Sequence, residues 1–158
     1  YFQSLIEDVV VSVGGSVGVV LPYNNSYIRL NNLFFLGGDN LRGFAVAGVG
    51  PRDAGTTDAL GGQYFYTTTT ELSFPLYGIP KEIGLLGKAF VDTGSLWGNQ
   101  ATAFGASILD SQLMRVGTGF GVQWISPFGP IRVDYTFPVV QEVWDKTQNF
   151  RFSFGTRF

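Results

Sequence analysis

The sequence predicts an all-β fold, an antiparallel transmembrane β-barrel to which this chain contributes a C-terminal fragment of about six strands. Three observations support this prediction. Apolar and polar residues alternate along six segments, charged residues avoid the apolar side of each segment, and long and short connections alternate between segments. The last segment, residues 150–158, shows the alternation most clearly, because its Phe residues share one side and its Arg residues share the other.

The six predicted strands follow one another along the chain. They span residues 8–21, 63–74, 83–92, 115–125, 131–137 and 150–158. Their side chains alternate with the period of two that a strand imposes, with valines, tyrosines or phenylalanines on one side and serines, threonines, glycines or charges on the other. A tilted strand of about 9–11 residues crosses a bilayer, and most of these segments reach that length.

Charged residues fall on the polar side of the predicted strands. They are Glu71, Lys88, Asp92, Arg115, Arg132, Asp134, Arg151 and Arg157. A charge that faces lipid at the bilayer midplane costs about 2–4 kcal/mol, whereas a water-filled interior tolerates it. A soluble sheet with one half-buried face predicts a similar alternation, so the alternation by itself leaves that alternative open.

The connections between the strands separate by length. Residues 22–61, 94–114 and 139–149 form long connections, and residues 75–82 and 126–130 form short ones. In the second short connection Pro127, Gly129 and Pro130 set a tight turn. Outer-membrane barrels have short periplasmic turns and long outer loops, an asymmetry that a soluble sandwich does not require. We therefore expect a periplasmic turn at Pro127, Gly129 and Pro130.

Composition excludes several classes of function. The 158 residues include no Cys and no His, and 10 Lys and Arg stand against 12 Asp and Glu for a net charge of −2. Without Cys there is no disulfide scaffold or thiolate metal site, and without His the commonest general base is absent. No basic stripe suggests nucleic acid. We expect no enzyme activity, no metal and no cofactor.

Four motifs occur in a characteristic order. They are residues 36–44 (Leu-Gly-Gly-Asp-Asn-Leu-Arg-Gly-Phe), residues 90–94 (Phe-Val-Asp-Thr-Gly), residues 123–130 (Gln-Trp-Ile-Ser-Pro-Phe-Gly-Pro) and the terminal Phe158. In this order they closely resemble the C-terminal barrel region of the BamA family of outer-membrane assembly factors, within the bacterial surface antigen superfamily. The resemblance covers residues 5–158.

The resemblance implies a site inside the barrel. The long loop, residues 22–61, would fold into the lumen, and its tip motif would meet a motif on the barrel wall. The tip motif is Leu41, Arg42, Gly43 and Phe44, and the wall motif is Phe90, Asp92 and Gly94. Arg42 is expected to pair with Asp92, since an arginine fork holds a carboxylate bidentately. The alternatives are a solvated Arg42 and an ordinary strand-ending turn at residues 92–94.

The resemblance also implies a function. The family folds and inserts β-barrel proteins into the bacterial outer membrane through a lateral seam beside the C-terminal strand, which here carries Phe150, Phe152, Phe154 and Phe158. The implied partners are outer-membrane lipid, unfolded β-barrel client proteins and, through N-terminal domains missing from this chain, assembly-complex lipoproteins. The alternatives are a polypeptide-secretion pore, a translocation-assembly relative, or a small structural or adhesin barrel, for which six strands are too few.

Residues 1–4 match the end of an engineered protease-cleavage sequence. We interpret them as the remnant of an expression tag. The barrel portion is then residues 5–158, and we expect the natural protein to continue upstream of Leu5. A fragment of an open sheet has two unpaired edges, so we expect this chain to self-associate through them.

Overall fold

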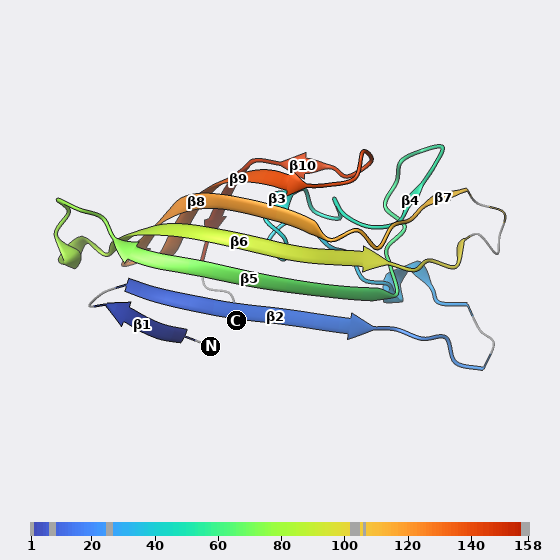
Figure 1. The fold of residues 1–158 in the computed structure, drawn as a ribbon, viewed down its shortest axis with the longest axis horizontal. Helices are drawn as coiled ribbons and strands as arrows, with labels where there is room; N and C mark the ends of the chain where they lie inside the picture. The colour runs from blue at the N-terminus through green and yellow to red at the C-terminus, as the bar shows by residue number, and fades with distance from the viewer. Residues whose placement is uncertain (1, 7–8, 25–26, 102–104, 106, 156–158) are drawn as a thin grey trace.

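One antiparallel sheet dominates the molecule. The computed structural model describes residues 2–6, 9–24, 27–101, 105 and 107–155 of the 158-residue chain. In these residues seven strands pair in the order β1-β2-β5-β6-β8-β9-β11 (Figure 1). Their bounds are β1 (Phe2–Ile6), β2 (Val9–Val19), β5 (Tyr64–Pro75), β6 (Leu85–Trp97), β8 (Arg115–Ser126), β9 (Gly129–Val140) and β11 (Phe150–Phe154). The predicted all-β antiparallel fold is confirmed, and each predicted strand corresponds to one of these.

The third predicted strand was drawn too short. β6 continues to Trp97, past the predicted end at residue 92. Gly94 pairs with Thr67 of β5 on one side and with Arg115 of β8 on the other, so the ladder holds the strand through this point. The alternative of a strand-ending turn at residues 92–94 is therefore wrong.

The fifth predicted strand also ended too early. β9 continues to Val140 across Pro138, a residue without a backbone N–H donor. The register between β8 and β9 shifts between Val116 and Gly117, opposite this proline. A bulge is one of the few places where a sheet accommodates proline.

The first strand includes residues that the sequence analysis left outside the fold. Phe2–Ile6 forms β1 and pairs antiparallel with β2, with Gln3 opposite Val11. The backbone of these residues extends the sheet by one strand. Their origin in an expression tag stays a prediction.

The two faces of the sheet differ in polarity. On β9 and β11, Phe137 and Phe152 are 46% and 61% exposed on one face, whereas Asp134 and Thr136 are buried on the other. We call these the apolar face and the polar face. The soluble-sheet alternative requires the apolar rows to be buried, and their exposure contradicts it.

The short turns lie at one end of the sheet and the long connections after β2 and β6 lie at the other, as the alternation of lengths predicted (Figure 1). The β5–β6 turn, which contains the 3-10 helix η2 (Lys81–Ile83), and the β8–β9 turn lie at one end of the sheet. The long connections that follow β2 and β6 lie at the other end. In the described part of the chain, no helix has the length and hydrophobicity needed to cross a bilayer.

The core forms between the sheet and one long connection. Residues 20–63, which we call the inner loop, contain η1 (Leu30–Asn32), β3 (Gly43–Phe44) and β4 (Arg52–Asp53). β3 pairs with β10 (Thr147–Gln148), and β4 pairs with β7 (Ile108–Leu109). The buried apolar cluster joins four loop residues to one residue of β6; it contains Leu36, Leu41, Phe44, Val49 and Leu96. The inner loop is thus packed against the polar face of the sheet.

Candidate functional site

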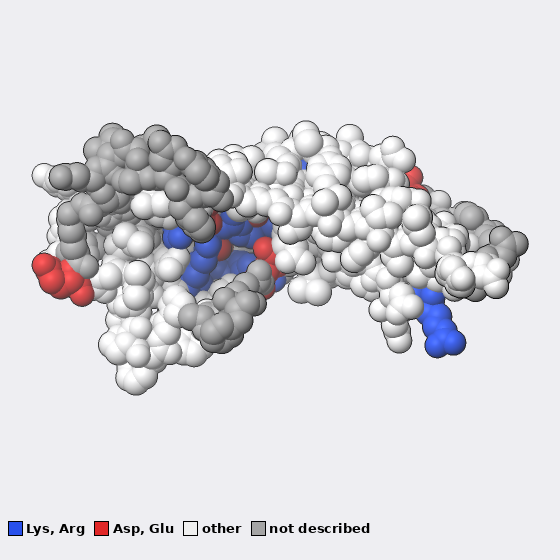
Figure 2. Space-filling view, turned by 90° about the horizontal axis from the view of Figure 1, so that it is seen from below, with Lys and Arg blue, Asp and Glu red and all other residues white. Residues whose placement is uncertain are grey.

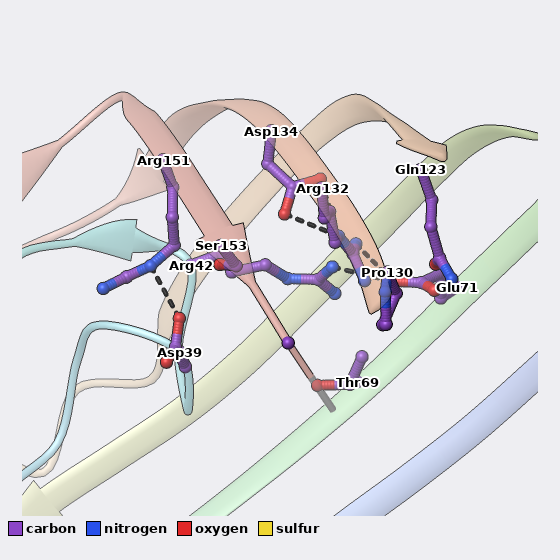
Figure 3. Close-up of a pocket in the computed structure, with 11 residues that line it drawn as sticks. Asp39, Arg42, Thr69, Glu71, Gln123, Pro130, Arg132, Asp134, Arg151 and Ser153 are labelled. Carbon is purple, nitrogen blue, oxygen red and sulfur yellow. Dashed lines mark hydrogen bonds and ion pairs between the residues drawn. The ribbon is translucent and has the colours of Figure 1, made fainter. Parts of the chain in front are cut away.

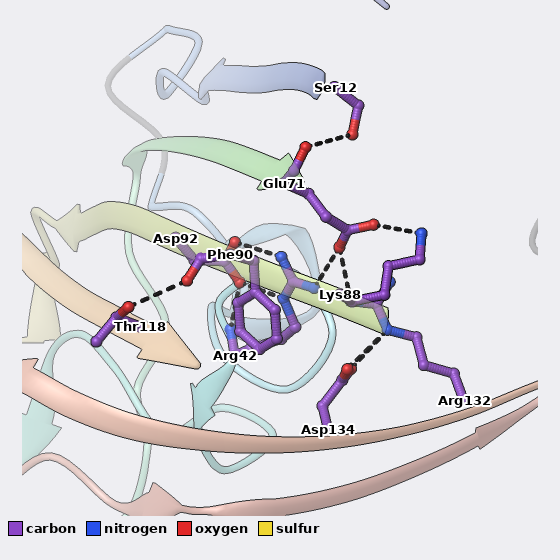
Figure 4. A network of polar contacts seen from close by, with 9 residues as sticks. All are labelled: Ser12, Arg42, Glu71, Lys88, Phe90, Asp92, Thr118, Arg132 and Asp134. Atoms are coloured by element: carbon purple, nitrogen blue, oxygen red, sulfur yellow. Dashed lines mark hydrogen bonds and ion pairs between the residues drawn. The ribbon is translucent and has the colours of Figure 1, made fainter. Parts of the chain in front are cut away.

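Charged side chains from four parts of the chain meet on the polar face beneath the inner loop (Figure 4). We call this set the charge cluster; its members are Arg42, Glu71, Lys88, Asp92, Arg132 and Asp134. Seen from below relative to Figure 1, charged residues line a hollow near the middle of an otherwise largely uncharged surface (Figure 2). Three cations face three carboxylates, so the formal charges of the cluster cancel.

Glycines of β8 leave room for the cluster. A Cβ atom on Gly117 would collide with the carbonyl oxygen of Arg42, and one on Gly121 would collide with the Asp134 carboxylate. The alternation of Gly117, Gly119 and Gly121 therefore keeps this part of β8 free of side chains on the polar face. The loop tip can then approach the backbone of the sheet directly.

Arg42, at the tip of the inner loop, binds two carboxylates. Its Nε donates to Asp92 Oδ2 at 2.6 Å and its Nη2 donates to Asp92 Oδ1 at 2.7 Å, a bidentate arrangement. The backbone N–H of Arg42 also donates to Asp92 Oδ2, at 3.1 Å. Its Nη1 donates to Glu71 Oε2 at 2.7 Å. The structure thus brings Arg42 and Asp92, the two residues that the resemblance paired, into direct contact.

Glu71 on β5 connects the rest of the cluster. Besides Arg42, its carboxylate accepts hydrogen bonds from Lys88 Nζ at 2.7 Å and from Arg132 Nη2 at 2.6 Å. Arg132 Nε in turn donates to Asp134 Oδ2 at 2.7 Å. Ion pairs therefore run without interruption from β6 through the inner loop and β5 to β9.

Burial makes these ion pairs depend on one another. Asp92 is 1% exposed and Arg42 is 7% exposed. Burial opposes the charge on Arg42, but its hydrogen bonds and Coulomb attraction to Asp92 and Glu71 outweigh that effect and raise the pKa of Arg42. Breaking a buried pair by removing one partner costs about 3–5 kcal/mol, because the other charge stays buried and unpaired. The cluster therefore fixes the position of the loop tip.

The neighbours of Arg42 anchor the same tip. Leu41 and Phe44 are fully buried in the apolar cluster. Gly43 has a φ of 96°, and a Cβ atom there would lie 3.0 Å from Thr136 Cγ2 on β9. Both the backbone conformation and the close approach favour glycine at this position.

Two residues of the wall motif lie against the inner loop, Phe90 beside Arg42 and Gly94 beside Leu36. The guanidinium carbon of Arg42 lies 3.5 Å from the centre of the Phe90 ring, so the cation is held over an aromatic face. A Cβ atom on Gly94 would lie 2.9 Å from the carbonyl oxygen of Tyr66 and 3.4 Å from Leu36 Cδ2. Gly94 therefore lets Leu36 of the inner loop pack close to β6.

The remaining predicted residues lie away from the cluster. Phe150, Phe152 and Phe154 are exposed on the apolar face of β11, and Phe158 lies outside the described residues. Pro127 lies in the short β8–β9 turn, and Gly129, the first residue of β9, has a φ of 124°.

A cavity of about 450 Å³ lies beside the charge cluster (Figure 3). Pro130 of β9 contributes to its lining, and so do the cluster residues Arg42, Glu71, Arg132 and Asp134. Across the cavity, Arg151 of β11 pairs with Asp39 of the inner loop, with Nε 2.7 Å from Oδ1. Within the described ranges, no group of three or more His, Cys, Asp or Glu residues is placed to hold a metal ion.

Comparison with known proteins assigns the family. Residues 1–158 match the model of the Omp85 superfamily domain. The chain belongs to the Omp85 superfamily. It is 35% identical over 156 residues to the outer membrane protein assembly factor BamA of Neorickettsia risticii (strain Illinois), an alignment that covers 99% of this chain and 20% of the relative.

Two further proteins extend the comparison of this Omp85 chain. BamA of Neisseria meningitidis serogroup B is 26% identical over 181 residues, covering 100% of this chain and 23% of the relative. The crystal structure of BamA from Haemophilus ducreyi lacking POTRA domains 1–3 superposes with a TM-score of 0.83 at 23% identity, covering 96% of this chain and 32% of that one. The shared fold is therefore that of the BamA barrel.

These matches confirm the predicted resemblance to the BamA family and the predicted location. The Omp85 chain belongs in the bacterial outer membrane. It spans about a fifth of the length of the two curated relatives.

Sequence reasoning missed several contacts of the site. It placed Glu71 and Arg132 on polar strand sides but assigned neither to the site, although opposite charges on the same side of nearby strands are a usable signal. It also missed the Arg115–Asp145 pair, which joins Nε to Oδ2 at 2.9 Å with both side chains fully buried. No local pattern indicates that pair, because Asp145 lies in an irregular connection.

Proposed function

We propose that this chain is the C-terminal part of the barrel of an outer-membrane insertase, which folds β-barrel proteins and inserts them into the outer membrane. The name that the curated relatives carry, outer membrane protein assembly factor, supports this role over a secretion pore. The observation that carries the proposal is the short strand β11 beside β9; its other edge, which we call the open edge, would face strands of the barrel that lie outside this chain. This strand ends the sheet, and among the described residues its strand partner is β9.

The open edge belongs to a weakly attached strand. Among the described residues, which end at Gly155, β11 contains 5 residues, whereas its neighbour β9 contains 12. A short edge strand has few ladder bonds to lose when it separates from its neighbour, and an unpaired strand edge recruits other strands. Pairing with such an edge is β-augmentation, in which main-chain hydrogen bonds supply the affinity. We infer that a client strand pairs with this edge during assembly.

The hydrogen-bond pattern identifies which backbone groups are available. Thr136 N–H donates to the carbonyl of Asn149, and Gly155 N–H donates to the carbonyl of Pro130, so residues 149 and 155 face β9. Antiparallel ladders alternate, so residues 151 and 153 also face β9. The N–H and C=O groups of Phe150, Phe152 and Phe154 consequently point to the open edge. These three residues form the surface that we assign to client pairing.

The remaining parts of the proposal follow from this mode of action. Strand pairing needs no catalytic group, so we infer that the protein is not an enzyme. The exposed apolar face would contact outer-membrane lipid, and unfolded β-barrel proteins would be the clients. Assembly-complex lipoproteins would bind domains outside this chain.

Phe152→Pro in the full-length protein tests the proposal. It removes one N–H from the open edge and none from the bonds to β9, while Phe152→Ala is the matched control that removes the ring and keeps the N–H. One hydrogen bond has a net value of about 0.5–1.5 kcal/mol, so we expect client folding into proteoliposomes to slow about 2- to 12-fold relative to Phe152→Ala. Equal client folding rates for the two variants, both with intact barrels, would contradict the role of this edge.

A further inference from the structure

The inner loop and β11 share an ion pair that the charge cluster does not include. Arg151 lies on the polar face of β11, and its Nε is 2.7 Å from Oδ1 of Asp39 in the inner loop (Figure 3). The side chain of Arg151 is 16% exposed and that of Asp39 is 40% exposed. The pair is therefore partly hydrated, unlike the buried pair between Arg42 and Asp92.

The backbone of the loop is shaped to receive Arg151. Gly38, which precedes Asp39, has a φ of 68°. A Cβ atom on Gly38 would lie 3.1 Å from Val46 Cγ2 and 3.2 Å from Arg151 Nη2. The absence of a side chain at Gly38 lets the guanidinium lie close to the loop backbone. Gly38 and Asp39 together therefore form the part of the loop that the Arg151 guanidinium contacts.

The segment that leads into β11 is attached to the same loop. Ala45 N–H donates to the carbonyl of Lys146 at 2.8 Å, and Lys146 N–H donates to the carbonyl of Gly48 at 2.9 Å. Further along, β3 pairs with β10, with Gly43 opposite Gln148. Backbone bonds therefore hold the residues before β11, and the Asp39–Arg151 pair is the side-chain contact that continues this attachment into the strand itself.

We propose that the Asp39–Arg151 pair is a latch through which the inner loop holds β11 in place beside β9. The charge cluster anchors the loop tip to β5 and β6, so a contact from the tip to β11 ties the edge strand to the far wall. A partly exposed ion pair is weak because water screens it, so it opens far more easily than the buried cluster. In the proposed function, release of this latch precedes separation of β11 from β9; the latch itself is a structural property that can be measured without any client.

Amide hydrogen exchange of the full-length protein in lipid tests the latch. Asp39→Asn removes the charge with little change in shape, and we expect the amides of Arg151 and Ser153, which bond to β9, to exchange about two- to fivefold faster. Exchange in β2 and β5 should stay unchanged. Glu82→Gln, a charge loss in the exposed β5–β6 turn, is the matched control and should leave β11 as it is.

Two further measurements separate a latch from a general loss of stability. A reversed pair, Asp39→Arg with Arg151→Glu, should bring exchange in β11 back to within twofold of the unmodified protein. Salt at about 1 M should accelerate exchange in the unmodified protein to the level of Asp39→Asn, and should have little effect on that variant. Unchanged exchange in Asp39→Asn, or acceleration by salt that is equal in both proteins, would overturn the latch. Failure of the client-folding test with Phe152→Pro would leave these exchange rates as they are, so the two proposals can fail separately.

Discussion

Replacing Arg42 should release the inner loop from the barrel wall. Arg42→Met keeps the length and much of the apolar stem of the side chain but removes its charge and its donors. Three side-chain hydrogen bonds are lost, two to Asp92 and one to Glu71. Glu71 keeps Lys88 and Arg132 as partners, whereas Asp92, at 1% exposure, loses the cation that neutralises it.

The magnitude follows from that difference between the two carboxylates. Leaving Asp92 buried without its partner should lower the free energy of unfolding by about 3–5 kcal/mol. Arg42→Lys keeps the charge but cannot reproduce the bidentate fork. A hydrogen bond to a charged group is worth about 1.5–3 kcal/mol, so the lysine variant should lose about that much. The expected order of stability is Arg42, then lysine, then methionine.

A double variant isolates the pair itself. Arg42→Met combined with Asp92→Leu removes both charges and leaves no unpaired group from this pair in the interior. It should therefore be more stable than the sum of the two single changes predicts, with a coupling of about 0.5–3 kcal/mol.

Urea unfolding of the full-length protein in detergent, followed by tryptophan fluorescence, measures these differences. Arg29→Met is the control, since Arg29 is an exposed arginine of the same loop, and it should stay within about 0.5 kcal/mol of the unmodified protein. If Arg42→Met unfolded at the same urea concentration as Arg29→Met, the idea that the cluster fixes the loop would be refuted.

Two other predictions concern the glycines of the sheet and its edges. Gly117→Ala should lower the free energy of unfolding by about 1–3 kcal/mol, because its Cβ would collide with the carbonyl oxygen of Arg42. The control Gly14→Ala, whose Cβ would meet nothing within 4 Å, should be nearly neutral in the same urea assay. Equal effects of the two changes would contradict the close approach of the loop to β8. The 158-residue chain by itself should self-associate, since β1 and β11 each pair on one side among the described residues. Light scattering should show less association for Phe152→Pro than for Phe152→Ala. A monodisperse monomer without detergent would contradict this prediction.

Local alternation was enough to place the strands and their faces. Val13 and Val17 of β2, like Phe150 and Phe152 of β11, are exposed on the apolar side that period-two counting assigned to them. The errors came at strand ends. The third strand was predicted to end at Asp92. Asp and Gly commonly terminate strands, but pairing on both sides of Gly94 overrides that local preference.

The pair between Arg42 and Asp92 was accessible only through the resemblance to a family. The residues alone showed a carboxylate that needed a partner and an arginine in a loop, with nothing to join them. Asp39 was harder still, because it meets Arg151 only after the inner loop has folded back across the polar face. Glu71 meets Lys88 and Arg132 through strand register, and it meets Arg42 only through the inner loop. Contacts of this kind depend on strand register and loop path, which a local pattern does not encode.

The amino-acid sequence by itself determined which residues of each strand form the apolar face and which form the polar face, since a strand sends neighbouring side chains in opposite directions whatever it pairs with. Only the tertiary structure decided which charges meet. Register places Gly121 of β8 opposite Asp134 of β9, and the path of the inner loop brings Arg42 to Asp92 and Asp39 to Arg151. Partners in an ion pair must lie within about 4 Å of each other, and that proximity is a property of the folded chain alone.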